Sequence, residues 1–153
     1  MKSITFVCLG NICRSPIAEG CAIKLAEENN LKLDISSSGI GSWHIGESPC
    51  ENSIKVCKTN NVDISNLVAS QFDKKQIDFY DLVVALDDNN VASLKQLGAK
   101  NILKLGSYGY NSQDVPDPYF FDGFEGFDKV FAMIDECVIK LFEEKVLLKE
   151  DQA

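Results

Sequence analysis

The chain has 153 residues, of which 45% are hydrophobic, and a formal net charge of −8. This length and apolar content suit one domain with a substantial core, whereas so acidic a chain is a poor partner for nucleic acid, which is bound through many Lys and Arg side chains. No apolar run approaches the ~20 residues that span a bilayer, and the N-terminus lacks a secretory signal pattern. We therefore expect a single domain over residues 1–153, located in the cytoplasm, with neither nucleic acid nor a membrane as a partner.

The chain has six cysteines and one histidine, and these counts limit the metal sites and redox reactions that it can support. In a cytoplasmic chain that is large enough to rely on its core, we expect the cysteines to be reduced thiols rather than structural disulfides. The chain has no Cys-x-x-Cys pair, and its cysteine spacings do not resemble a zinc site. We expect neither a metal nor a cofactor.

The first half of the chain begins with a short apolar run at 3–9, which predicts a strand. Apolar side chains spaced as on one helix face follow Pro16 and predict a helix that ends near Asn29 and Asn30. Alternating apolar residues at 31–38 then predict a second strand.

A loop rich in Gly and Ser follows the second predicted strand. Ser48 and Glu51 fit a capping box, with Pro49 at the first position of a helix. This pattern predicts a second helix that runs to about Lys58.

The second half continues the alternation. An apolar run predicts a buried strand at 81–87, and a helix follows at 89–98 with Gly98 as its stop. We expect a further strand at 101–107 and a long amphipathic helix at 124–146. Because strands and helices alternate, the fold class is α/β, with a parallel sheet covered on both faces. The connection 106–123 is long, aromatic and acidic, as functional loops often are.

The segment from Cys8 to Pro16 follows the first strand and leads into a helix, which is where α/β folds bind ligands. Gly10 and Asn11 tolerate left-handed or strained backbone. A sharp turn there can point its amides inward as an anion site at a helix N-terminus. A thiol at the mouth of such a site is favoured as the thiolate.

Arg14 is the only arginine of the chain, and the other basic residues are lysines. A guanidinium holds phosphate oxygens through two parallel N–H donors. A cysteine such as Cys8 is by itself more often a small buried hydrophobe than a nucleophile. Its spacing from Arg14 favours a thiolate that attacks a bound phosphate ester.

The pattern Cys-x5-Arg-Ser resembles the phosphate-binding loop of cysteine-dependent tyrosine phosphatases, and the whole chain is similar to the low molecular weight protein tyrosine phosphatase family. The resemblance covers most of the chain. It implies a single domain with a four-stranded parallel sheet, helices on both faces and an N-terminal phosphate-binding loop. It rests on the strings VCLGNICRSPIAEG (7–20), SSSGIGSWHIG (36–46), YDLVVALDDNN (80–90) and VPDPYFFDGFEGFDKV (115–130).

The resemblance implies four catalytic roles. Cys8 would be the nucleophile that forms a phosphocysteine, and Arg14 would bind the phosphoryl oxygens. Ser15 would hydrogen-bond the thiolate and make it a better leaving group. Asp117 would protonate the leaving phenolate and then activate water.

A general acid is also expected independently of the resemblance, because expelling a tyrosyl oxygen needs a proton donor. Asp114 and Asp122 lie on the same loop and compete for this role. We favour Asp117 because Pro118 stiffens its approach and because the family has its acid there.

Further roles follow from the similarity alone. Asn11 and Ser37 would hold the loop in shape, and Asp87 would orient the loop or Arg14. Cys13 would be the reversible disulfide partner of Cys8, with a plain packing role left open. Residues on the loop and around the cleft would bind the phosphate and the phenyl ring: Leu9, Gly10, Asn11, Ile12, Cys13, Trp43, Tyr119 and Phe120.

The resemblance implies a phosphotyrosine-containing protein as substrate, with inorganic phosphate and vanadate as competitive ligands. We expect a monomer with at most weak self-association. Family members commonly have a histidine and an arginine in the segment where Asn66 and Ser70 stand here. This departure concerns loop rigidity and oligomer contacts rather than the catalytic set.

Two other functions remain to be weighed. An arsenate reductase of related fold needs further cysteines after the third strand, but none lies between Cys57 and Cys137. A catalytically silent phosphotyrosine-binding module would be expected to lack the nucleophile, the arginine or the acid, and none of these is missing.

Overall fold

The computed structural model describes residues 3–118 and 124–147. Its centre is a four-stranded parallel sheet in the order β2-β1-β3-β4, as expected. All six residues of β1 are buried, because this strand lies between two others and has a packed layer on each face. The strands are β1 (Ser3–Cys8), β2 (Asp34–Gly39), β3 (Leu82–Ala85) and β4 (Ile102–Lys104).

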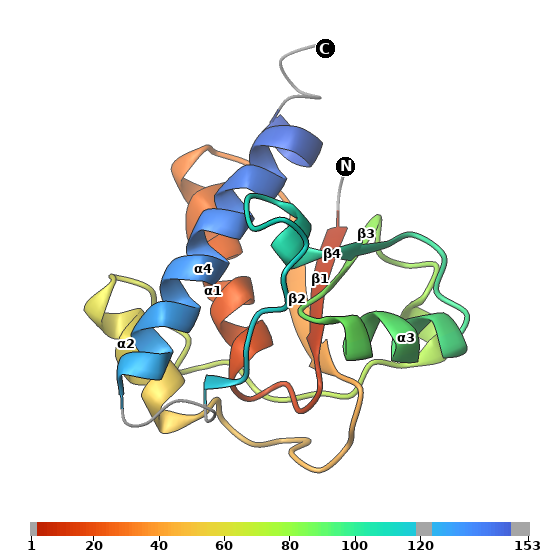
Figure 1. Ribbon diagram of the computed structural model, residues 1–153, viewed down its shortest axis with the longest axis horizontal. Coiled ribbons are helices and arrows are strands. Elements are labelled where there is room, and N and C mark those ends of the chain that lie inside the picture. Colours follow the sequence, from red (N-terminus) through yellow and green to blue (C-terminus); the bar gives the residue numbers. More distant parts are fainter. Residues whose placement is uncertain (1–2, 119–123, 148–153) are drawn as a thin grey trace.

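Helices cover both faces of the sheet (Figure 1). α1, α2 and α4 pack together over one face, where Phe6 and Val84 point, and α3 covers the other, where Val7 and Leu94 meet. The arrangement confirms the predicted α/β fold with helices on both sides. The helices are α1 (Arg14–Glu28), α2 (Glu51–Thr59), α3 (Asp88–Gln96) and α4 (Glu125–Phe142), with short 3-10 turns at Lys74–Gln76 and Leu105–Ser107 and a π-turn at Glu143–Leu147.

Two strand boundaries differ from the predictions by three residues. The second strand was expected from residue 31, but the Leu31 amide donates to the carbonyl of Ala26 and closes α1, so β2 begins only at Asp34. The fourth strand was expected to reach residue 107, but the chain turns into a 3-10 helix at Leu105. The stop of α3 at Gly98 is confirmed, with φ of +98° just after the C-cap Leu97.

The predicted start of the second helix is wrong. Cys50 is the N-cap of α2, and no side chain caps this end. Pro49 therefore lies before the cap and not at the first helical position. The amide of Cys50 instead donates to the carbonyl of Ile12, 2.7 Å away, so a contact with the loop after β1 sets where α2 begins.

Within the described residues, no helix combines the length and the apolar character needed to cross a membrane. The carboxyl ends of β1 and β3 open toward the loop after β1, the segment 40–50 and the segment before Pro118 (Figure 1). Cys8, Arg14 and Asp117, which the sequence predicts to be catalytic, lie at this end of the sheet.

Candidate active site

The loop from Cys8 to Arg14, here named the Cys8 loop, joins β1 to α1. Asn11 has a φ of +58°, the left-handed conformation that asparagine tolerates better than most residues. Gly10, the other residue expected to adopt it, does not have a positive φ. Gly39 at the end of β2 lets the loop pack closely, because a Cβ there would lie 2.9 Å from the carbonyl oxygen of Leu9.

The Cys8 sulfur is buried and accepts hydrogen bonds from its own loop and from the first turn of α1. The amide of Asn11 lies 3.3 Å from the sulfur, and Ser15 Oγ lies 3.0 Å from it. Because Asn11 Nδ2 donates to Ser15 Oγ at 2.7 Å, the hydroxyl hydrogen of Ser15 is available to the sulfur. Both donors stabilise negative charge on Cys8.

A chain of hydrogen bonds supports this arrangement from outside the loop. Asn11 Nδ2 also donates to Ser37 Oγ at 2.8 Å, and Ser37 donates to Glu19 Oε1 at 2.5 Å. The Ser70 amide donates to Asn11 Oδ1 at 3.0 Å. The Asn11 side chain thus ties β2 and the segment around Ser70 to the Cys8 loop.

Sequence reasoning missed Glu19. Burial raises the pKa of its carboxyl group, and the bond from Ser37 opposes that rise. The available signal was its place one helical turn after Ser15, which puts both side chains on one face of α1.

Arg14 is buried, and one nitrogen of its guanidinium group is held by two hydrogen bonds. Its Nη1 donates to Asp87 Oδ2 at 2.7 Å and to the Val115 carbonyl at 2.9 Å. Asp87 is itself fixed as the N-cap of α3, where Oδ1 accepts the Asn90 amide at 2.7 Å. The other guanidinium nitrogens make no hydrogen bond within the described residues, and Arg14 lines the cavity beside Cys8.

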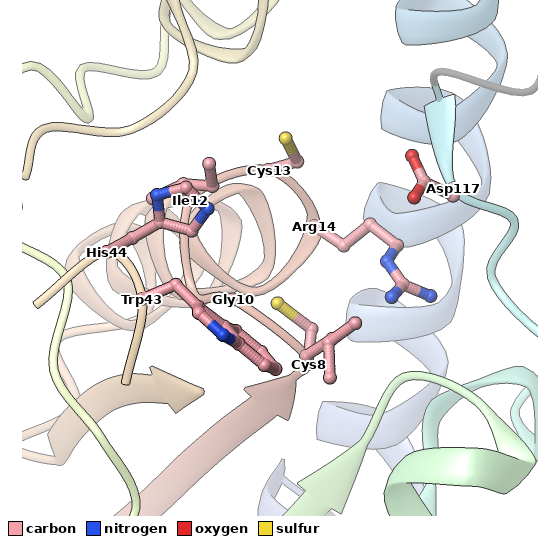
Figure 2. A pocket seen from close by; sticks show the side chains of 9 residues that line it. Cys8, Gly10, Ile12, Cys13, Arg14, Trp43, His44 and Asp117 are labelled. Carbon is pink, nitrogen blue, oxygen red and sulfur yellow. The ribbon is translucent and has the colours of Figure 1, made fainter. Parts of the chain in front are cut away.

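Asp117 also reaches this cavity, and its segment is anchored two residues earlier. The Val115 amide donates to the Leu86 carbonyl at 2.9 Å, while the Val115 carbonyl accepts from Arg14. Figure 2 shows the Cys8 sulfur with Trp43 on one side and with Arg14 and Asp117 on the other.

Of the competing carboxylates, Asp114 is engaged elsewhere. It pairs with Lys104 Nζ at 2.8 Å and accepts the Asp88 amide at 3.0 Å, at an exposed position. The bond from Lys104 lowers the pKa of Asp114, which disfavours the protonated form that a general acid needs. Asp122, Tyr119 and Phe120 lie outside the described residues.

The cavity has a volume of about 220 Å³. Leu9 and Trp43 form an apolar rim and are 51% and 68% exposed. His44, which the sequence did not single out as a binding residue, lies beside Trp43 with its Nδ1 2.8 Å from Glu47 Oε2. The lining residues are Cys8, Leu9, Gly10, Ile12, Cys13, Arg14, Trp43, His44 and Asp117.

The expectation that every cysteine is reduced is wrong for one pair. Cys13 forms a disulfide with Cys50, with a Cα–Cα distance of 5.4 Å, and so its sulfur is not bonded to Cys8. The two residues are 37 positions apart, and the contact between the Cys8 loop and the start of α2 brings them together. Cys8 is a free thiol, as are Cys21, Cys57 and Cys137.

Comparisons with known proteins agree with this geometry. Residues 3–153 match the family model described as low molecular weight phosphotyrosine protein phosphatase. The low molecular weight protein-tyrosine-phosphatase YfkJ of Bacillus subtilis (strain 168) is 40% identical over 133 residues, which are 82% of this chain and 85% of that protein. The low molecular weight protein-tyrosine-phosphatase PtpA of Staphylococcus aureus (strain MRSA252) is 34% identical over 144 residues, 90% of this chain and 92% of that one.

Solved structures give the same result. The crystal structure of YfkJ from Bacillus subtilis superposes with a TM-score of 0.82 over 95% of this chain and 97% of its own, at 34% identity. Vibrio vulnificus Wzb, solved in complex with benzylphosphonate, superposes with a TM-score of 0.84 over 94% and 98%, at 28% identity. The chain therefore belongs to the low molecular weight phosphotyrosine protein phosphatase family and is a protein-tyrosine-phosphatase.

Proposed function

We propose that the protein hydrolyses phosphotyrosine in proteins, and small aryl phosphates, through a phosphocysteine on Cys8. One observation carries the proposal. A free thiol that accepts two hydrogen bonds lies in one cavity with a guanidinium and a carboxyl group, those of Arg14 and Asp117.

In the first step the Cys8 thiolate attacks phosphorus in line with the tyrosyl oxygen. The Arg14 donors that are not used by Asp87 and Val115, together with the amides of the Cys8 loop, hold the equatorial oxygens where charge spreads in the transition state. Asp117 gives a proton to the leaving phenolate. The substrate leaves as tyrosine, and the phosphoryl group stays on sulfur.

In the second step Asp117 removes a proton from water, which attacks the phosphocysteine. Cys8 then leaves as a thiolate, and the hydroxyl of Ser15 and the amide of Asn11 stabilise the charge it acquires. The ion pair with Asp87 keeps the Arg14 guanidinium in one orientation for both steps. A guanidinium that had to reorient in each step would lower the reaction rate.

The shape of the cavity supports selection for a phenyl ring. The sulfur lies at the bottom, while Leu9 and Trp43 stand exposed at the rim, so a phosphate on a long aromatic arm reaches the thiolate with its ring against apolar side chains. The family resemblance implies that Tyr119 and Phe120 also bind the ring. Benzylphosphonate in the Wzb complex is a ligand of the same shape. We expect inorganic phosphate and vanadate to compete with substrate, and the cytoplasm to be the compartment.

The test compares hydrolysis of a phosphotyrosine peptide by the wild type and by Cys8→Ser, Asp117→Asn and Asp114→Asn. Cys8→Ser should show no turnover. Asp117→Asn should lose about 10²- to 10⁴-fold in kcat with little change in KM, as for removal of a general acid. Asp114→Asn is the matched control and should stay near wild type, because Lys104 already holds that carboxylate away from the cavity.

Two results would reject the mechanism. Full activity in Cys8→Ser would exclude Cys8 as the nucleophile. Equal losses of activity in Asp117→Asn and Asp114→Asn would mean that Asp117 is not the one general acid of the reaction. Binding of the peptide without any turnover by the wild type would favour a silent phosphotyrosine-binding module.

A further inference from the structure

The Cys13–Cys50 disulfide lies at the edge of the catalytic cavity. Cys13 lines the cavity together with Cys8 (Figure 2), and its sulfur is bonded to Cys50 at the start of α2. Cys13 is partly exposed, while Cys50 is 9% exposed. An attacking thiolate in the cavity therefore reaches the Cys13 sulfur more readily than the Cys50 sulfur.

Other contacts keep these residues together whether or not the sulfurs are bonded. The Cys50 amide donates to the Ile12 carbonyl at 2.7 Å, and Ser53 Oγ donates to the Cys13 carbonyl at 3.1 Å. Reduction would thus leave two thiols side by side. Both are N-caps, Cys13 of α1 and Cys50 of α2, where the helix N-terminus favours a thiolate.

The remaining cysteines cannot take part in exchange at this site. Cys21, Cys57 and Cys137 are buried in the core between α1, α2 and α4. None of them lines the cavity. Three sulfurs remain that can exchange a single disulfide, those of Cys8, Cys13 and Cys50.

We propose that Cys13 and Cys50 form a thiol–disulfide exchange site. When Cys8 is oxidised, the disulfide is transferred to Cys13 and Cys50, and Cys8 becomes a thiolate again. The site takes a hydroperoxide as oxidant and a dithiol as reductant. The proposal rests on the proposed function, because it assumes that Cys8 is the reactive thiolate that must be preserved.

The exchange begins with the reduced protein. The Cys8 thiolate attacks the peroxide, an S–O bond forms as the O–O bond breaks, and Cys8 becomes a sulfenic acid while hydroxide or an alkoxide leaves and takes a proton from solvent. The Cys13 thiolate then attacks the Cys8 sulfur. A Cys8–Cys13 disulfide forms, the S–O bond breaks, and the hydroxide leaves as water with the proton from the Cys13 thiol.

The last step depends on Cys50. Its thiolate attacks the Cys13 sulfur, the Cys13–Cys50 bond forms, and Cys8 leaves with the electron pair of the broken bond. Cys8 is the favoured leaving group because the Asn11 amide and the Ser15 hydroxyl already hold its charge. In sum, one peroxide is reduced, two thiols become a disulfide, and Cys8 is restored. A dithiol then reduces Cys13–Cys50 with two electrons and two protons.

The experiment follows the activity of the fully reduced full-length chain toward an aryl phosphate after about one equivalent of hydrogen peroxide is added without thiol. The wild type should lose activity and then regain most of it, and peptide mapping should find the Cys13–Cys50 disulfide. Cys50→Ser should have the same activity before oxidation. After oxidation it should remain at least about tenfold less active until a dithiol is added, with Cys8 held in a disulfide.

Cys57→Ala is the matched control, since Cys57 lies on the same helix and is free. It should recover like the wild type. Recovery of Cys50→Ser at the wild-type rate would overturn the proposal, as would a wild type in which the Cys8–Cys13 disulfide persists without exchange.

A second measurement needs no variant. Wild type that already contains the Cys13–Cys50 disulfide has no thiol to receive the oxidation, so the same peroxide should inactivate it without recovery. Spontaneous recovery would again overturn the proposal. If the reduced chain hydrolysed no phosphate ester at all, the proposed function would fail, whereas the mapping of disulfides would still decide the exchange.

Discussion

Two groups of buried cysteines, Cys8 alone and the core residues Cys21, Cys57 and Cys137, differ in the chemical surroundings of the sulfur. Cys8 lies in a cavity and accepts hydrogen bonds from an amide and a hydroxyl. Cys57 and Cys137 are enclosed by α1, α2 and α4, and burial raises the pKa of each thiol to about 12. Burial, with the nearby Asp135 carboxylate, likewise raises the pKa of Cys21.

Burial alone does not distinguish these thiols, because Cys8 is 3% exposed and Cys57 is fully buried. The difference lies in what surrounds the sulfur. Aimed N–H and O–H donors compensate the loss of water around a thiolate, whereas methyl and methylene groups do not. The predictions below test this division, from the largest effect to the smallest.

Alkylation at neutral pH should separate the two groups most strongly. A thiol with a pKa of about 12 is ionised in only about one molecule in 10⁵ at pH 7. Iodoacetamide should therefore label Cys8 alone in the native, unreduced protein, and should label Cys8, Cys21, Cys57 and Cys137 in denaturant. Mass spectrometry of the labelled peptides measures this. Early labelling of Cys57 or Cys137 would show that the division does not hold.

Arg14→Lys tests whether the pocket needs the guanidinium fork or only a positive charge. Lysine can pair with Asp87 but cannot also bind the Val115 carbonyl and two phosphoryl oxygens in fixed geometry. We expect kcat/KM to fall by about 10²- to 10³-fold with little change in melting temperature. Lys104→Arg is the control, at a largely buried lysine that pairs with Asp88 and Asp114 and does not line the cavity, and it should leave activity unchanged. Near-normal activity in Arg14→Lys would mean that charge suffices.

Asn11 tests how much of the pocket depends on one side chain. Asn11→Gly keeps the left-handed backbone but removes the amide that joins Ser15, Ser37 and the Ser70 amide, so kcat/KM should fall by about tenfold or more. Asn11→Ala should lose the same activity and about 1 kcal/mol more of stability, because alanine resists a positive φ. The control is Asn111→Gly, at an exposed positive-φ position, which should affect neither. Full activity in Asn11→Gly would contradict the organising role of the amide.

The regular features of the fold could be predicted from the sequence because they depend on local periodicity. The run at 81–87 and the helix after Pro16 bury their apolar side chains in any α/β packing. The turn containing Asn11 has a local signature as well. These features place the Cys8 loop at the carboxyl end of β1 before any tertiary contact is known.

The features that the sequence did not predict depend on contacts between distant segments. The Cys13–Cys50 disulfide needs α2 to begin against the Cys8 loop, and the capping-box pattern at Ser48 gave no sign of this. Glu19 matters only because β2 brings Ser37 beside it. Such pairings are decided by the order β2-β1-β3-β4, which local patterns do not encode.

Cys137→Ser tests the other side of the comparison, because it should affect stability and leave catalysis alone. Cys137 is fully buried on α4, where a hydroxyl loses its water. The serine hydroxyl can bond the carbonyl one turn earlier, which limits the cost to about 1–3 kcal/mol of unfolding free energy. Cys137→Ala, which adds no polar group, should cost less than serine does. Urea unfolding with kcat measured on the same samples decides the matter: a fall in kcat at unchanged stability would link the core thiol to the pocket and break the division between the two groups.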